Sequence, residues 1–141
     1  MLAAVDEKGG ELYLWQAQAG ADYGRGLYLV RRVPVRKLVV EAPHPLFDLR
    51  SALVAAEVFQ ATGARALAVA GTHRCANEAP TDCDGVTSIC NSGELGTYRE
   101  SDMAHVDGSS FPLFHDVLSA DHPATIAFPL HGLAPDDYAP A

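Results

Sequence analysis

Residues 38–70 read LVVEAPHPLFDLRSALVAAEVFQATGARALAVA, and this stretch decides the fold. The apolar runs at 37–42 and 64–70 are typical of short strands that are covered on both faces. Between them, apolar residues recur at helical spacing: Leu53, Val54, Val58 and Phe59. Gly63 suits the position just after a helix that ends near Thr62. We therefore predict a strand, a helix and a parallel strand with a right-handed crossover.

The sequence before this unit predicts a β-hairpin at the edge of the same sheet. Residues 11–18 are strand-like, with Leu12, Leu14 and Gln16 on one face and Tyr13, Trp15 and Ala17 on the other. Residues 20–26 are rich in glycine, and 27–33 form a second strand-like run. Together these patterns predict an α/β fold with a mixed sheet. The length of 141 residues fits a single domain spanning 1–141.

The sequence after this unit begins with a long irregular stretch. Residues 75–96 have no hydrophobic periodicity, and a loop of this length in a compact domain is usually functional or a lid. A second helix is predicted over 107–120, a last strand over 124–130, and a frayed end over 134–141. His115 within that helix and His122 in the following turn are interpreted as surface residues.

Composition excludes two classes of partner. The net charge of −8 argues against nucleic acid, and the basic cluster at 31–37 fits the solvated edge of a hairpin. No apolar run approaches the length that spans a membrane. The N-terminus as written lacks the pattern of a signal peptide, which favours a cytoplasmic location.

The three cysteines, Cys75, Cys83 and Cys90, lie in the irregular stretch. Their spacings do not fit a CxxC zinc motif. Cys83 and Cys90 could close a short loop as a disulfide, which would favour an exported protein in an oxidising compartment. The alternative is three unpaired thiols in a cytosolic loop.

Three of the six histidines, His44, His73 and His131, directly follow apolar strand-like runs. The carboxyl ends of parallel strands meet at one edge of a sheet, where ligands bind in open α/β folds. Zinc accepts imidazole nitrogen and carboxylate oxygen, and Asp48 lies four residues after His44. We predict one Zn²⁺ held by His44, Asp48 and His131, with an open position for water. The alternative role for Asp48 is the N-cap of the helix, which Ser51 also suits.

Two further groups of side chains are candidates for substrate binding and catalysis. His73 and Arg74 are candidates for substrate binding. The Arg74 guanidinium is suited to clamp a substrate carboxylate, and its alternative role is a structural salt bridge. The segment 98–105 packs polar and ionisable groups into one short stretch. Asp102 and His105 in it either orient the metal ligands or form an acid/base pair, unless the segment is only a solvated helix start.

These motifs resemble the N-formylglutamate amidohydrolase and poly-γ-glutamate hydrolase group of zinc carboxypeptidase-like hydrolases. The resemblance covers residues 38–132 and is carried by short motifs: Pro43-His44-Pro45 through Asp48, Gly71-Thr72-His73-Arg74, Tyr98-Arg99-Glu100-Ser101-Asp102-Met103-Ala104-His105 and Leu130-His131-Gly132. It implies a three-layer αβα fold of the carboxypeptidase or phosphorylase/hydrolase type, with zinc on His44, Asp48 and His131. The implied substrate is a small acidic acyl-amino acid or γ-glutamyl peptide, its carboxylate held by Arg74 or by Arg99.

The sequence departs from that family in two places. The family's acidic ligand is often Glu at a different spacing, whereas this chain offers Asp48. The family's catalytic Glu follows the second His, whereas the ten residues after His131 contain none. Either Glu100 or Asp102 then serves as the base, or the chain is a shortened, non-catalytic relative that binds a metal or ligand. A third hypothesis is a hydrolase that uses Cys75 beside His73 as nucleophile.

Overall fold

Six strands form one mixed sheet in the order β1-β2-β3-β5-β4-β6. A computed structural model describes residues 2–5, 11–16, 26–121 and 124–132. Its elements are β1 (Leu2–Val5), β2 (Glu11–Gln16), β3 (Leu27–Arg31), β4 (Arg36–Ala42), α1 (Ser51–Thr62), β5 (Ala64–Val69), the 3₁₀ turn η1 (Met103–His105), α2 (Ser110–Asp121) and β6 (Ile126–Pro129). The predicted turn before Gly26, His122 and the predicted frayed end lie outside the described residues.

The pairing of the strands places three carboxyl ends at one edge of the sheet. β4 pairs in parallel with β5 on one side and with β6 on the other. β1, β2 and β3 continue the sheet by antiparallel pairing, and β3 joins β5. The predicted mixed α/β architecture is therefore confirmed, as are the β2–β3 pairing and the strand–helix–strand unit. β1 was not predicted.

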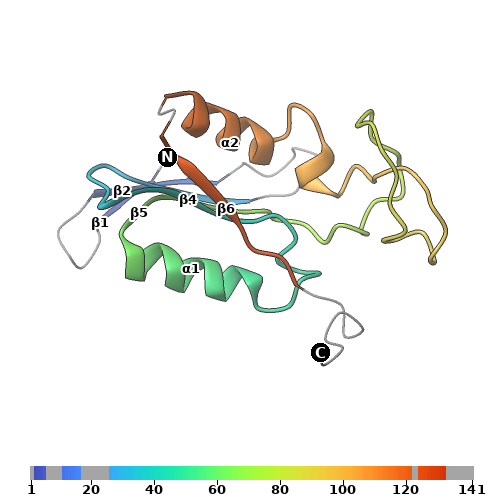
Figure 1. Cartoon of the computed structure of the whole chain (residues 1–141), viewed down its shortest axis with the longest axis horizontal. Helices are drawn as coiled ribbons and strands as arrows, with labels where there is room; N and C mark the ends of the chain where they lie inside the picture. Colours follow the sequence, from blue (N-terminus) through green and yellow to red (C-terminus); the bar gives the residue numbers. More distant parts are fainter. Residues whose placement is uncertain (1, 6–10, 17–25, 122–123, 133–141) are drawn as a thin grey trace.

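The two helices lie on opposite faces of the sheet (Figure 1). On the α1 face, Val40 and Leu67 of the central strands pack with Ala55 and Phe59. The other face is covered by α2, whose Leu118 packs with Val39 and Ala66. Because neighbouring residues of a strand point to opposite faces, the apolar runs of β4 and β5 supply both cores at once.

The buried face of α1 differs in part from the predicted one. Phe59 is buried and Val58 packs against the same core, but Leu53 and Val54 are 66% and 44% exposed. The face turned to the sheet instead consists of Ser51, Ala55 and Phe59, spaced four residues apart. Small side chains at the first two positions allow the start of the helix to lie close to the sheet.

Gly63 ends α1 in the left-handed conformation, with φ of 64°, as predicted. A Cβ atom there would lie 2.7 Å from Val35 Cγ2. We expect Gly63→Ala to lower the free energy of unfolding by about 2 kcal/mol, since conformational strain and a clash add together. Gly93→Ala is the matched control, because Gly93 also has a positive φ but open space around it. Its loss should be about 1 kcal/mol, and equal losses in urea unfolding would contradict the clash with Val35.

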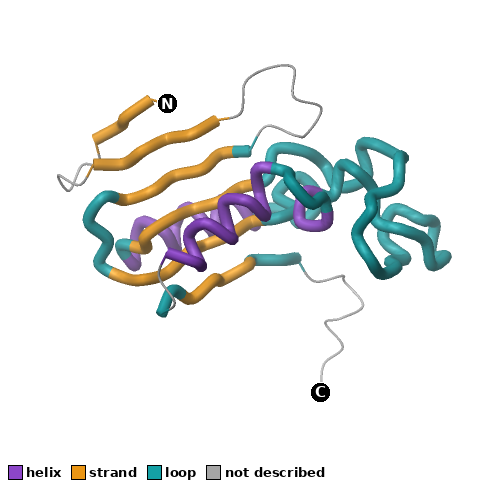
Figure 2. The backbone as a smooth tube through the Cα atoms, turned by 90° about the horizontal axis from the view of Figure 1, so that it is seen from above, coloured by secondary structure: helices purple, strands orange, loops and turns teal. Residues whose placement is uncertain are grey.

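A long loop extends from the edge where β4, β5 and β6 end (Figure 2). Between β5 and η1 it contains no helix or strand, only the isolated bridges Pro80–Arg99 and Thr87–Gly96. This confirms the prediction of an irregular segment over 75–96. The loop starts and returns beside the ends of the parallel strands, so its residues can contact side chains that those strands present.

Candidate metal centre

His44 lies just beyond the carboxyl end of β4, and its side chain is only 3% exposed. Ala42 and Pro43 before it are also buried. The ladder between β4 and β5 continues to this point, because Ala70 N–H donates to the Ala42 carbonyl at 3.0 Å. The imidazole therefore follows directly on backbone that is still hydrogen-bonded to the neighbouring strand.

Asp48 is brought back to His44 by a helical turn between β4 and α1. The backbone N–H groups of Phe47 and Asp48 both donate to the His44 carbonyl, at 3.0 and 2.7 Å. Asp48 makes no side-chain cap; α1 begins after Arg50, which takes a left-handed conformation with φ of 69°. The N-cap interpretation of Asp48 and Ser51 is therefore wrong, and the Asp48 carboxylate instead faces the His44 ring.

His131 arrives from β6, the strand on the other side of β4. Leu130 N–H donates to the Glu41 carbonyl at 2.8 Å and so extends the parallel ladder to the neighbour of His131. Gly132 then passes close to Asp48, where a Cβ atom would lie 3.2 Å from Oδ1. The His131 side chain is 49% exposed, so the site opens to solvent on this side.

Three ligand atoms from these residues converge within 4.8 Å of one another. Asp48 Oδ2 is 3.6 Å from His44 Nδ1 and 3.4 Å from His131 Nδ1. These separations are too long for hydrogen bonds. Among the described residues, His44 Nδ1 and Asp48 Oδ2 are also buried atoms without a hydrogen-bond partner. Buried polar atoms without partners are costly, so a cation between them would remove a specific penalty.

The two separations from Asp48 also match the size of a tetrahedral metal site. Zinc–ligand bonds of about 2.0–2.1 Å at tetrahedral angles place neighbouring ligand atoms roughly 3.3 Å apart. The two distances from Asp48 Oδ2, 3.4 and 3.6 Å, are close to this value. Two imidazoles and one carboxylate favour a transition metal over Mg²⁺ or Ca²⁺, which prefer oxygen ligands. The group His44, Asp48 and His131 could therefore hold a metal ion.

Asp102 fixes the orientation of the His44 ring from behind. Its Oδ1 is 2.8 Å from His44 Nε2, and its Oδ2 accepts hydrogen bonds from Arg74 Nε and Nη2 at 3.0 and 2.6 Å. If Nε2–H donates to Asp102, the lone pair of Nδ1 faces Asp48. A carboxylate that orients a histidine in this way is the usual support for a metal ligand.

The charge state of Asp102 follows from the same contacts. Burial by itself raises the pKa of this carboxyl, but the hydrogen bond and charge of His44 and those of Arg74 outweigh it. The pKa of Asp102 is therefore lowered below its ordinary value, and the group is ionised at neutral pH. Both oxygens already have partners, which suits Asp102 to positioning His44 rather than to moving protons.

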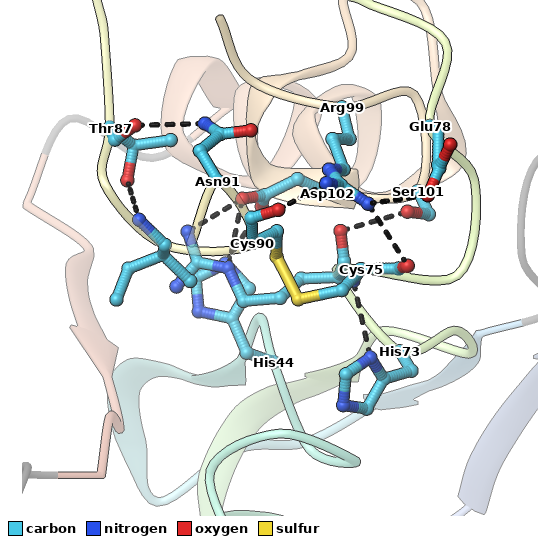
Figure 3. The surroundings of a disulfide bond; sticks show 12 residues. His44, His73, Cys75, Glu78, Thr87, Cys90, Asn91, Arg99, Ser101 and Asp102 are labelled. Atoms are coloured by element: carbon cyan, nitrogen blue, oxygen red, sulfur yellow. Dashed lines mark hydrogen bonds and ion pairs between the residues drawn. A yellow bond between two sulfur atoms is a disulfide. The ribbon is translucent and has the colours of Figure 1, made fainter. Parts of the chain in front are cut away.

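The other candidates for catalysis and substrate binding lie outside the ligand group. Glu100 is exposed, and its Oε2 accepts a hydrogen bond from Asn77 Nδ2 at 3.0 Å. Arg99 donates to the backbone carbonyls of Cys75 and Cys90. His73 Nδ1 accepts a hydrogen bond from Cys75 N–H, as Figure 3 shows.

His105 stacks on Tyr98, with ring centroids 3.6 Å apart, and its Nδ1 lies 3.7 Å from Cys83 Sγ. Burial lowers the pKa of His105. The nearby Asp102 carboxylate raises that pKa, while the charges of His44, Arg74 and His131 lower it further. The net shift is downward, so His105 is a neutral imidazole at pH 7 and contacts Cys83 rather than pairing with Asp102.

The cysteine pairing differs from the predicted one. Cys75 and Cys90 form a disulfide, and Cys83 is free (Figure 3). The Thr87–Gly96 bridge folds this part of the loop back on itself, and Cys90 then meets Cys75. The prediction of a Cys83–Cys90 bond is therefore wrong. A hydrolase with Cys75 as nucleophile is excluded in this state, since its sulfur is bonded to Cys90.

Sequence reasoning missed several features of this site. Of the two roles predicted for Arg74, the contacts above show the structural salt bridge, but its partner, Asp102, was not predicted. Sequence reasoning also missed the close approach of Gly132 to Asp48. The available signal was the glycine directly after His131, because a glycine beside a predicted ligand indicates that two backbones pass closely.

None of the helices in the described part of the chain has both the length and the apolar character needed to cross a membrane. A scan against protein-family models and searches of curated proteins and of solved structures find no significant match to this chain.

Proposed function

We propose that this protein is a zinc-dependent hydrolase of an amide bond, with one Zn²⁺ held by His44, Asp48 and His131. The observation that carries the proposal is the convergence of three potential ligand atoms, two of them buried without hydrogen-bond partners. The mixed sheet with a helix on each face fits the three-layer αβα fold of the carboxypeptidase or phosphorylase/hydrolase type.

Each residue has a separate task in this proposal. Asp102 holds the His44 ring so that Nδ1 faces the centre, and Arg74 balances the charge of Asp102. His131, half exposed, closes the ligand set on the side from which a substrate arrives. When bound, zinc supplies a Lewis acid for the amide carbonyl and for an attacking water.

The proposed substrate is an acidic acyl-amino acid or a γ-glutamyl peptide. This proposal is supported by the resemblance of the motifs around His44, Arg74, Asp102 and His131 to those of the N-formylglutamate amidohydrolase and poly-γ-glutamate hydrolase group. The Arg74 guanidinium already pairs with Asp102, so a substrate carboxylate would have to share that cation. Because Asp102 has partners on both oxygens, Glu100 is the more suitable carboxylate to move a proton.

The test is amide hydrolysis by the zinc-loaded protein, measured by release of free amine. N-formyl- and N-acetylglutamate, a γ-glutamyl dipeptide and neutral N-acetylleucine form the substrate panel. We expect acidic substrates to be cleaved faster than the neutral one and cleavage to be lost in His131→Ala. Turnover no greater than that of His131→Ala on every substrate would contradict the enzymatic proposal.

A second candidate is a non-catalytic protein that binds a metal ion through the same residues. It is favoured because both candidate bases already have hydrogen-bond partners: the Asp102 oxygens contact His44 and Arg74, and Glu100 accepts a hydrogen bond from Asn77. Among the described residues, no further His, Cys, Asp or Glu joins the ligand group. Stoichiometric zinc without hydrolysis of any panel member would select this candidate.

A further inference from the structure

The Cys75–Cys90 disulfide is adjacent in sequence to Arg74, the residue that pairs with Asp102 beside the metal ligand His44. Cys75 directly follows Arg74, and Arg74 grips Asp102, which in turn bonds His44. Figure 3 shows the Cys75–Cys90 bond beside Asp102 and the His44 ring. Both cysteines are partly exposed, so a small thiol reagent can reach the bond.

Hydrogen bonds join the disulfide to the segment that carries Asp102. The Arg99 guanidinium donates to the carbonyl oxygens of Cys75 and Cys90, so it bridges the two halves of the bond. The Arg99 carbonyl then accepts a hydrogen bond from Asp102 N–H at 2.8 Å. Ser101 Oγ donates to the Arg74 carbonyl at 2.8 Å. Asp102 is thus tied to both ends of the covalent bridge.

Besides the disulfide, the loop between the two cysteines is held by the Pro80–Arg99 and Thr87–Gly96 bridges and by hydrogen bonds of Asn77 with Ser101 and Glu100. It contains no helix or strand, and most of its residues are exposed. Segments with exposed backbone and few buried apolar contacts open with little free energy. Without the bond, the Cys90 half is held near Cys75 by the Arg99 side chain, which donates to two neutral carbonyls and lies 3.9 Å from the exposed Glu78 carboxylate.

We propose that the Cys75–Cys90 disulfide is a redox latch that sets the position of the His44 imidazole through Arg99, Arg74 and Asp102. In the oxidised state the latch holds Asp102 against His44. In the reduced state the segment carrying Asp102 loosens, and His44 loses its fixed orientation. The consequence for metal affinity rests on the proposed zinc centre, whereas the effect on Asp102 does not.

The redox step uses a dithiol reductant. Two electrons and two protons from the dithiol break the S–S bond and leave thiols on Cys75 and Cys90, while the reagent closes to its cyclic disulfide. Disulfides persist in oxidising compartments and are reduced in the cytosol, so the two states correspond to two cellular settings.

The test compares oxidised protein, protein reduced by dithiothreitol, and the Cys75→Ser/Cys90→Ser double variant. Cys83→Ser is the matched control, because Cys83 is not in a disulfide. The hydrogen-exchange rates of the Asp102 and His105 amides in metal-free protein measure directly whether the segment that carries Asp102 loosens on reduction. Zinc affinity, measured by competition with a chelator, shows whether this loosening weakens metal binding.

We expect about tenfold faster exchange at these amides after reduction, and a loss of zinc affinity of roughly 10- to 100-fold, as for removal of a ligand-supporting group. Cys83→Ser should match the oxidised protein. Exchange within twofold in the oxidised and reduced forms would overturn the latch. Faster exchange on reduction without zinc binding in either form would support the latch and contradict the zinc centre. If the double variant does not fold, reduced native protein decides the question.

Discussion

His131→Ala is expected to weaken zinc binding by roughly two orders of magnitude. Structural zinc sites with four ligands contribute about 10–16 kcal/mol, or roughly 3 kcal/mol for each ligand. A loss of this size corresponds to about a hundredfold in the dissociation constant. Because the His131 side chain is 49% exposed, the free energy of unfolding of the metal-free protein should change by less than about 0.5 kcal/mol.

The matched control for this substitution is His115→Ala. His115 is also partly exposed, but its Nδ1 pairs with Glu41 Oε1 at 2.8 Å, away from the ligand group. Its removal should leave zinc affinity unchanged. Isothermal titration with zinc measures the affinity of both variants. Equal affinities for His131→Ala and His115→Ala would show that His131 is not a metal ligand.

Asp102→Ala is expected to have the largest effect on stability, a loss of about 3 kcal/mol in the free energy of unfolding. The Asp102 side chain is 3% exposed and that of Arg74 is 11% exposed, so truncation leaves a nearly buried guanidinium without its anion. Breaking a buried ion pair from one side typically costs about 3–5 kcal/mol. The His44 Nε2 atom loses its partner at the same time.

Two comparisons separate the positioning role of Asp102 from simple stabilisation. Asp102→Asn keeps the shape and one acceptor oxygen, so we expect it to recover part of the stability but to bind zinc at least about tenfold more weakly than the native chain. Glu100→Ala is the control, because Glu100 is exposed and should leave both stability and affinity unchanged. Native zinc affinity in Asp102→Asn would show that the Asp102 charge does not support His44. Urea unfolding and zinc titration supply the two readouts.

Much of the fold could be predicted from the sequence because apolar runs and helical spacing reflect local geometry. The runs around Val39 and Ala66 predicted buried parallel strands, and Gly63 predicted the end of α1. The exposed positions of Leu53 and Val54 could not be predicted, since spacing alone does not say which apolar stripe faces the sheet. β1 was missed because a short edge strand has too few residues for a clear pattern.

The residues of the candidate site that follow parallel strands could be predicted from the sequence, whereas the contacts made by the irregular segment could not. His44 and His131 follow parallel strands, so the convergence of their side chains follows from the sheet. Arg74, Asp102 and Cys90 belong to an irregular segment whose contacts are set by long-range pairing rather than by local sequence. The disulfide partner of Cys90 was mispredicted for that reason, because proximity in sequence favoured Cys83.

Elemental analysis of the protein purified without added metal, repeated after chelator treatment and re-equilibration with zinc, tests the metal centre most directly. The separations among His44, Asp48 and His131 predict one transition-metal ion per chain, with nitrogen and oxygen neighbours at about 2.0–2.1 Å in X-ray absorption. A native chain that retains no ion after equilibration with stoichiometric zinc would contradict the account.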